Sequence, residues 1–167
     1  MKTYLASPLG FSQSTRYFMT VLESLLADSG YIVVNPWRLS DPREFQAAAG
    51  IEDEELRRQA LHGINMKVAG GNERVIRECD IVVAVLDGPD VDSGTASEIG
   101  FAFALGKRIY GYRGDFRRSG DNEGCIVNLQ VEYWIEKSGG CITTNLDALR
   151  ELLTGASRGN EREHRAL

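Results

Sequence analysis

The chain has 167 residues, of which 43% are hydrophobic, enough to bury one substantial core but too few for two independently stable domains. We therefore expect a single domain over residues 1–156, followed by a flexible tail over residues 157–167, which is polar and has no apolar period. Acidic residues outnumber basic ones by 24 to 19 and give a formal net charge of -5. This charge disfavours nucleic acid as a partner and favours small-molecule ligands.

Targeting and metal-binding signals are missing from the sequence as given. It holds no run of about eighteen apolar residues, so we expect no membrane span, no export signal and a cytoplasmic location. The cysteines, Cys79, Cys125 and Cys141, form no CxxC pair and have only two histidines to partner them. We expect them to be buried thiols in a reducing compartment, with no metal and no other cofactor.

Apolar runs rich in β-branched and aromatic residues alternate along the chain with segments of helical length. In chain order we expect a strand at residues 3–6, a helix at 14–29, a strand at 31–35, a helix at 52–78 with a break near Gly70 and Gly71, a strand at 81–86, a helix at 95–105, a strand at 108–112, a helix at 126–137, a weaker strand at 141–144 and a helix at 146–153. This alternation is typical of right-handed βαβ crossovers. It predicts an α/β, flavodoxin-like three-layer sandwich with a five-stranded parallel sheet.

The continuous apolar run at residues 81–86 suits a strand that is buried on both faces, so we place it in the middle of the sheet. In folds of this kind, ligands bind beyond the carboxyl ends of the strands. We therefore expect the loops after Ala6, Asn35, Leu86 and Tyr112 to form the site.

The loop after the central strand carries several carboxylates. Asp87, Asp90 and Asp92 lie in a stretch shaped by glycine and proline, and Glu98 is expected in the first turn of the next helix. Each of these carboxylates also has a purely structural explanation. The spacing of Thr95 and Glu98 fits a capping box, in which the glutamate only closes the helix start, and loop aspartates often turn the backbone. Spacing alone therefore indicates a candidate site and no more.

Residues 92–107 read D-S-G-T-x-x-E-I-G-x-A-x-A-x-G-K and resemble the signature of the nucleoside 2-deoxyribosyltransferase family. Further matches are Y-L-A-x-P at residues 4–8 with Phe11, I-R-x-C-D at residues 76–80, Asn128 with Glu132, and S-G-G at residues 138–140. The resemblance spans roughly residues 4–142. Its motifs are short but specific in combination.

The resemblance implies an enzyme that moves 2-deoxyribose between purine or pyrimidine bases, with deoxynucleosides and free nucleobases as its partners. Glu98 would attack the anomeric carbon, expel the base and hold the sugar as a glycosyl ester until a second base takes it. Tyr4 would orient Glu98, although a core aromatic is the alternative. Asp92 would contact the sugar or base and is a possible proton donor, and Gly94 of the signature would contact the substrate.

Two further positions would complete the site. Phe11 would wall the base, unless it folds onto the core. Asn128 corresponds to an asparagine that reaches the sugar hydroxyl from a neighbouring subunit, which implies a homo-oligomer with shared active sites. An exposed surface asparagine is the alternative.

One position departs from the family pattern. Asn72 aligns with an aspartate that assists the leaving base in better-known members, and an amide cannot supply a proton. Asn72 could still bond a base edge, leaving protonation to Asp92 or to water and the range of bases open. Its alternative is an N-cap for the helix that ends at Glu78. Trp37 and Phe45 could line a base pocket, but core packing explains them equally well.

Two other functions compete with transfer. An N-glycosidase would hydrolyse 2'-deoxynucleosides or their 5'-phosphates. Ser93, Ser97 and Arg113 are candidates for the phosphate pocket that the 5'-phosphates would need. A non-catalytic nucleoside-binding module would use the same fold without turnover.

Overall fold

The structure, a computed structural model, describes the backbone of residues 1–164 and the side chains of residues 1–155. Its sheet has the strand order β2-β1-β3-β4-β5, with every neighbouring pair parallel. The strands are β1 (Lys2–Ala6), β2 (Ile32–Val34), β3 (Ile81–Val85), β4 (Arg108–Tyr112) and β5 (Ile142–Thr143). This confirms the flavodoxin-like α/β sandwich and places the apolar run of β3 in the middle of the sheet.

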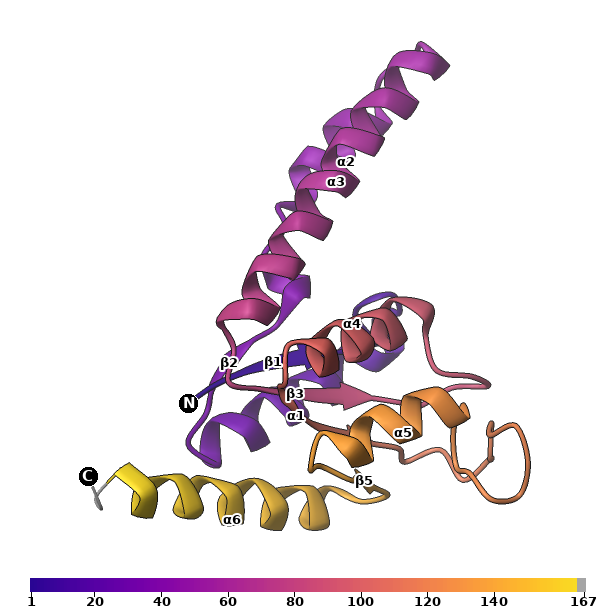
Figure 1. Cartoon of the computed structure of the whole chain (residues 1–167). Helices are drawn as coiled ribbons and strands as arrows, with labels where there is room; N and C mark the ends of the chain where they lie inside the picture. Colours follow the sequence, from indigo (N-terminus) through magenta and orange to yellow (C-terminus); the bar gives the residue numbers. More distant parts are fainter. Residues whose placement is uncertain (165–167) are drawn as a thin grey trace.

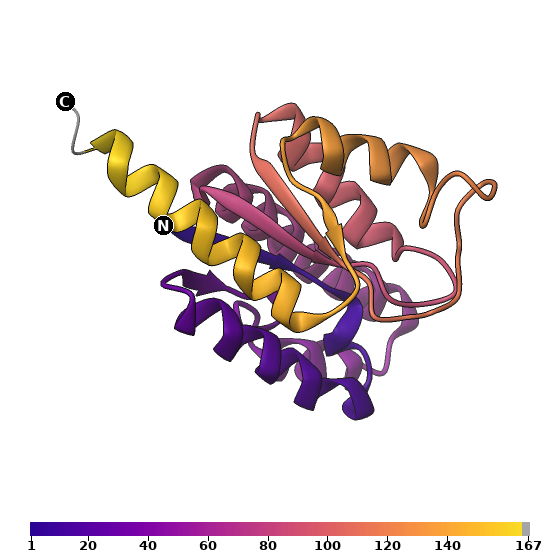
Figure 2. The same cartoon turned by 90° about the horizontal axis from the view of Figure 1, so that it is seen from below.

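Helices cover both faces of this sheet. They are α1 (Arg16–Asp28), α2 (Pro42–Ala49), α3 (Glu54–Glu78), α4 (Ser93–Ala104), α5 (Leu129–Lys137) and α6 (Leu146–His164), with short 3-10 turns η1 (Pro8–Gly10), η2 (Gln13–Thr15) and η3 (Pro36–Arg38). Figure 2 shows α1 and α6 together on one face and α4 and α5 on the other. None of the helices in the described part of the chain is both long and apolar enough to cross a membrane.

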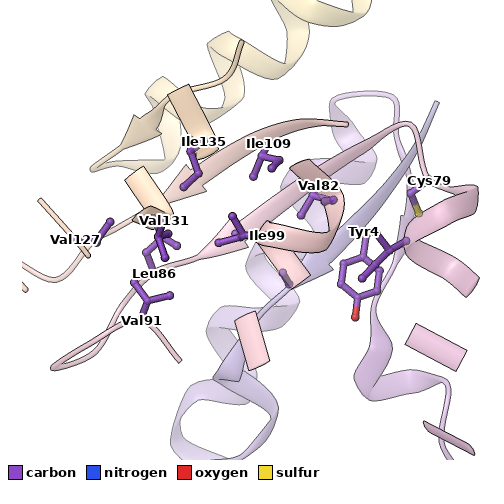
Figure 3. Packing of buried hydrophobic residues seen from close by; sticks show 14 residues of the cluster. Tyr4, Cys79, Val82, Leu86, Val91, Ile99, Ile109, Val127, Val131 and Ile135 are labelled. Carbon is purple, nitrogen blue, oxygen red and sulfur yellow. The ribbon is translucent and has the colours of Figure 1, made fainter. Parts of the chain in front are cut away.

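Strand alternation divides the core in two. On β1, Leu5 packs with the helices α1 and α6, whereas Tyr4 and Ala6 face the cluster formed with α4 and α5. Figure 3 shows the second cluster, with the Tyr4 ring at one end, near Cys79. Tyr4 of β1 thus lies in the core on the side of the sheet that α4, the helix carrying Glu98, covers.

Helices α2 and α3 form an arm that extends away from the sheet (Figure 1). Only the end of α3 near Ile76 is buried in the core. The expected break at Gly70 and Gly71 is wrong, because α3 runs through both glycines for 25 residues. Glycine disfavours a helix by only about 1 kcal/mol per residue, which the other residues of a long helix can offset.

Other element ends also differ from expectation. Helix α2 was not anticipated, although Asp41 as N-cap and Pro42 at the first position are the usual signals of a helix start. Helix α5 begins at Leu129 because Asn128 caps it. Helix α6 extends beyond residue 153 to His164. The flexible tail over residues 157–167 stays a prediction, and residues 165–167 lie outside the described residues.

Candidate active site

A cavity of about 460 Å³ lies beyond the carboxyl ends of β1 and β2, beside the start of α4. We call it the Glu98 chamber. Its lining residues are Ser7, Phe11, Pro36, Trp37, Ser40, Phe45, Asn65, Val68, Asn72, Asp92, Gly94, Thr95 and Glu98. The loops after β1, β2 and β3 all contribute, as expected, but the loop after β4 supplies none of these residues. The volume falls within the usual range for small-molecule sites.

Glu98 presents a carboxylate to this chamber. Its Oε1 accepts a hydrogen bond of 2.5 Å from the Tyr4 hydroxyl, while Oε2 has no hydrogen-bond partner among the residues whose side chains are described. Burial raises the pKa of Glu98 to about 7, the bond from Tyr4 opposes that rise, and the charge of Asp92 adds to it. A carboxylate with one anchored oxygen and one unbonded oxygen can act as a nucleophile or as an acid or base.

The capping-box explanation for Glu98 is wrong. The N-cap of α4 is Asp92, whose side chain accepts from the Thr95 amide at 2.9 Å. Helix α4 begins at Ser93, so Glu98 is in its second turn and not in the first as expected. Its oxygens are not used by the backbone amides that open the helix.

Tyr4 is a core residue whose hydroxyl also contacts Glu98, and its role in orienting a nucleophile stays a prediction. Its ring is fully buried in the core cluster on the α4 side of the sheet, and its hydroxyl donates to Glu98. Burial, then the nearby charge of Glu98, holds the pKa of Tyr4 far above its usual range. The phenol therefore stays protonated and is a constant donor to Glu98.

Asp92 combines a structural position with a place in the chamber wall. Both of its hydrogen bonds, from the Thr95 amide at 2.9 Å and the Thr95 hydroxyl at 3.3 Å, go to Oδ2. Oδ1 has no hydrogen-bond partner among the described side chains and backbone. A Cβ at Gly94 would lie 3.1 Å from Asp92 Oδ2, so glycine allows this close approach.

Two aromatic side chains meet at the chamber mouth. Phe11 is 75% exposed and meets Trp37 edge to face, with ring centroids 4.5 Å apart, so the alternative that Phe11 folds onto the core is wrong. Trp37 is fixed by a 2.7 Å bond from its indole nitrogen to the Ser7 carbonyl. For Trp37 and Phe45 the sequence left a base pocket and core packing as equal alternatives, and the structure places both on the chamber wall.

Two amide side chains of α3 also line the chamber. Asn72 lies inside α3, whose N-cap is Asp53, so the N-cap explanation for Asn72 is wrong. Asn65 was missed, yet the seven-residue spacing between Asn65 and Asn72 puts them on one helix face. That spacing was the available signal.

Asn128 is not among the chamber residues of the single chain. Its side chain accepts from the Gln130 amide at 3.0 Å and caps α5, and the residue is partly buried. A role through a neighbouring subunit stays a prediction.

The candidates for a phosphate pocket, Ser93, Ser97 and Arg113, do not line the chamber. Arg113 is 1% exposed, and its guanidinium donates to backbone carbonyls, those of Leu86, Gly88 and Arg117. Ser97 bonds the Ser93 carbonyl at 2.8 Å. Within the described part of the chain, no group of three or more His, Cys, Asp or Glu side chains is placed to hold a metal ion.

Comparison with known proteins identifies the family and the fold. The sequence model of the nucleoside 2-deoxyribosyltransferase family matches residues 3–130. A conserved protein from Enterococcus faecalis V583 has a similar structure, with a TM-score of 0.68, 24% identity, and coverage of 93% of this chain and 98% of that one. No curated protein sequence gives a significant match.

Two further solved structures share the fold at lower similarity. A 2-deoxyribosyltransferase from the psychrotolerant bacterium Bacillus psychrosaccharolyticus has a TM-score of 0.57 at 22% identity, over 90% of each chain. A CMP N-glycosidase from Clostridium botulinum has a TM-score of 0.53 at 19% identity, over 92% of this chain and 97% of that one. At these identities the likeness concerns the fold alone.

Proposed function

Because the chain belongs to the nucleoside 2-deoxyribosyltransferase family, we propose that it transfers 2-deoxyribose from one nucleobase to another through a covalent ester on Glu98. The observation that carries the proposal is the Glu98 carboxylate, which lines the chamber with one oxygen held by Tyr4. The unbonded oxygen is the nucleophile. With a pKa of about 7, a substantial fraction of Glu98 is ionised at neutral pH.

The reaction proceeds in two displacements. Glu98 Oε2 bonds to C1' as the bond from C1' to the first base breaks, and the leaving base takes up one proton. A nitrogen of the second base then attacks C1', breaks the ester and gives one proton back to Asp92, the donor in the first step, so atoms and charge balance over the cycle and the anomeric configuration is retained. The positive charge that develops on the sugar is stabilised by the Glu98 carboxylate.

The remaining wall residues are assigned to substrate binding. Asp92 contacts the sugar or base and donates the proton that the leaving base needs. Asn72 bonds the base edge, and the Phe11 ring walls the heterocycle, with the Trp37 ring nearly perpendicular to it. Gly94 allows the substrate to approach the start of α4.

We also propose that the active form is a homo-oligomer in which Asn128 of a second copy reaches the sugar hydroxyl. A mixing experiment tests this. Glu98→Ala and Asn128→Ala variants, each inactive alone, should regain activity when their subunits are exchanged, because some mixed sites then carry both intact residues. No recovery after verified exchange would contradict a shared site.

Base exchange tests the main proposal. The protein is incubated with 2'-deoxyadenosine and free cytosine, and chromatography follows new 2'-deoxycytidine and free deoxyribose. We expect new nucleoside from the parent and from Glu136→Ala, a control carboxylate exposed on α5, but none from folded Glu98→Ala. Mass spectrometry should find an added deoxypentosyl group on the peptide that contains Glu98.

Other outcomes point to the competing functions. Free deoxyribose without new nucleoside would mean that the protein hydrolyses nucleosides, as an N-glycosidase does, and does not transfer the sugar. Binding of nucleoside by both parent and Glu98→Ala, with no product from either, would mean a non-catalytic module. Undiminished exchange by Glu98→Ala would eliminate the ester mechanism.

A further inference from the structure

A second cavity, of about 290 Å³, adjoins the Glu98 chamber between α2 and α3. We call it the side hollow. The two cavities share the lining residues Ser40, Phe45, Val68 and Asn72. These four residues form a partition, so a ligand in the chamber that extends past them enters the side hollow.

The geometry of α3 explains the partition. Asn65, Val68 and Asn72 line the chamber, whereas Ile64 and Gly71, each one residue earlier, line only the side hollow. Successive helical residues point about 100° apart, so Val68 and Asn72 lie on the ridge between the two cavities. The side hollow thus opens beside the residue proposed to contact the base edge.

The side hollow has apolar side chains in its walls and charged residues that are exposed at its rim. Five of its lining residues are hydrophobic: Leu39, Phe45, Ile64, Val68 and Val75. Glu44 and Lys67 are exposed at its rim and neutralise each other in an ion pair of 2.7 Å, and Asp41 is bonded to Arg43. Arg74 is also exposed at the rim, so the charged groups lie at the open edge and the five apolar side chains offer contacts to an uncharged, apolar group.

Gly71 leaves room in this hollow. A Cβ built at Gly71 would meet no atom within 4 Å, although the residue is partly buried. Protein interiors are normally close-packed, and glycine is disfavoured inside a helix. At about 30 Å³ per water, the hollow has the volume of roughly ten waters, enough for a ring-sized substituent.

We propose, on the basis of the proposed function, that the transferred base can carry an apolar substituent of about benzyl size on its exocyclic amine. The base occupies the Glu98 chamber, and the substituent passes Phe45, Val68 and Asn72 into the side hollow. The substrate class thereby includes N-alkylated or N-arylmethylated nucleobases as well as plain ones.

The test compares matched base pairs as acceptors, with 2'-deoxyuridine as the sugar donor. The pairs are adenine with N6-benzyladenine and cytosine with N4-benzylcytosine, and the readout is the ratio of kcat/KM for the benzylated base to that for the plain base. Gly71→Leu fills the side hollow from α3. Gly70→Leu is the matched control, because its Cβ also meets open space but residue 70 lines neither cavity.

We expect the parent and Gly70→Leu to use at least one benzylated base with kcat/KM within about tenfold of the plain base, and Gly71→Leu to lower that ratio by about tenfold or more. An unchanged ratio in Gly71→Leu would overturn the proposal. Transfer of plain bases with rejection of both benzylated ones would overturn it as well.

Failure of the proposed function gives a different result. If no plain base is transferred, binding of the same four bases is measured by quenching of tryptophan fluorescence, since Trp37 lines the chamber. Tighter binding of a benzylated base, lost in Gly71→Leu and kept in Gly70→Leu, would still support the side hollow. Equal binding by all three proteins would refute it.

Discussion

The Tyr4 hydroxyl donates a 2.5 Å hydrogen bond to Glu98 Oε1 across 94 residues of sequence. It joins β1, in the sheet, to the second turn of α4. The Tyr4 ring is fixed in the core, so the hydroxyl holds the carboxylate in place. It also acts electrostatically, because a bond to the ionised form offsets part of the burial that raises the pKa of Glu98.

Tyr4→Phe should therefore lower activity and shift its pH dependence. The ring still packs, but the pKa of Glu98 rises above about 7, so less nucleophile is ionised at neutral pH. Hydrogen bonds to charged groups contribute about 1.5–3 kcal/mol, which corresponds to a loss of roughly tenfold to a hundredfold. The measurement is kcat/KM against pH, in which the acid limb should move to higher pH. An acid limb that stays where the parent has it would show that the bond does not tune Glu98.

The raised pKa of Glu98 also predicts how stability depends on pH. Because the pKa of Glu98 is about 7 in the folded protein and 4.5 for an unperturbed glutamate, the folded state binds more protons between these values. Stability from this group is therefore full below about pH 4.5 and is lost as pH rises to about 7.

Glu98→Gln removes this titration and should be more stable than the parent above pH 7, by up to about 3 kcal/mol at 1.36 kcal/mol per pKa unit. The amide oxygen can still accept from Tyr4. Chemical denaturation of both proteins at pH 5 and pH 8 measures the difference, which should be larger at pH 8. A difference that does not change with pH would contradict the raised pKa.

Much of the fold could be predicted because strand and helix periods are local properties of the sequence. The apolar run of β3 and the alternating helices indicated a parallel sheet and the edge where ligands bind. The continuity of α3 through Gly70 and Gly71 could not be predicted in this way, since the cost of two glycines is small enough for the rest of a 25-residue helix to offset. The start signals of α2, Asp41 and Pro42, were present but unused.

The site was predictable where a motif carried it and not where packing did. The signature pointed to Glu98 and Asp92, and both line one chamber. Asn65 and Trp37 lie outside the motif and reach the chamber only through the arm and the loop after β2. Arg113 resembled a phosphate ligand in the sequence, but its burial, a long-range property, assigns it to the backbone of neighbouring loops.

Two substitutions of Asp92 separate its role as N-cap of α4 from the effect of its charge. Asp92→Ala removes the N-cap of α4 and should lower the free energy of unfolding by about 0.5–2 kcal/mol. Asp92→Asn keeps an oxygen for the Thr95 amide, so its stability should stay within about 0.5 kcal/mol of the parent. Thermal or urea denaturation of both variants measures this split.

Asp92→Asn should also move the acid limb of kcat/KM to lower pH, opposite to Tyr4→Phe, because the charge of Asp92 raises the pKa of Glu98. If Asp92 donates the proton to the leaving base, kcat falls as well, and most for bases that are poor leaving groups. A variant with parental kcat for every base would remove Asp92 from the chemistry while leaving its capping role intact.

Substitution of Arg113 should lower the stability of the protein and leave substrate binding unchanged. Its buried guanidinium bonds three backbone carbonyls, and a lysine ammonium is a compact charge that cannot reproduce that planar fork. Arg113→Lys should therefore lower the free energy of unfolding by about 2–4 kcal/mol. If the residue served phosphate binding instead, the variant would stay nearly as stable while KM rose selectively for deoxynucleoside 5'-phosphates over deoxynucleosides. Because the guanidinium is occupied and lies outside the chamber, we expect that KM ratio to equal the parent's when both proteins are measured at a temperature where they are folded.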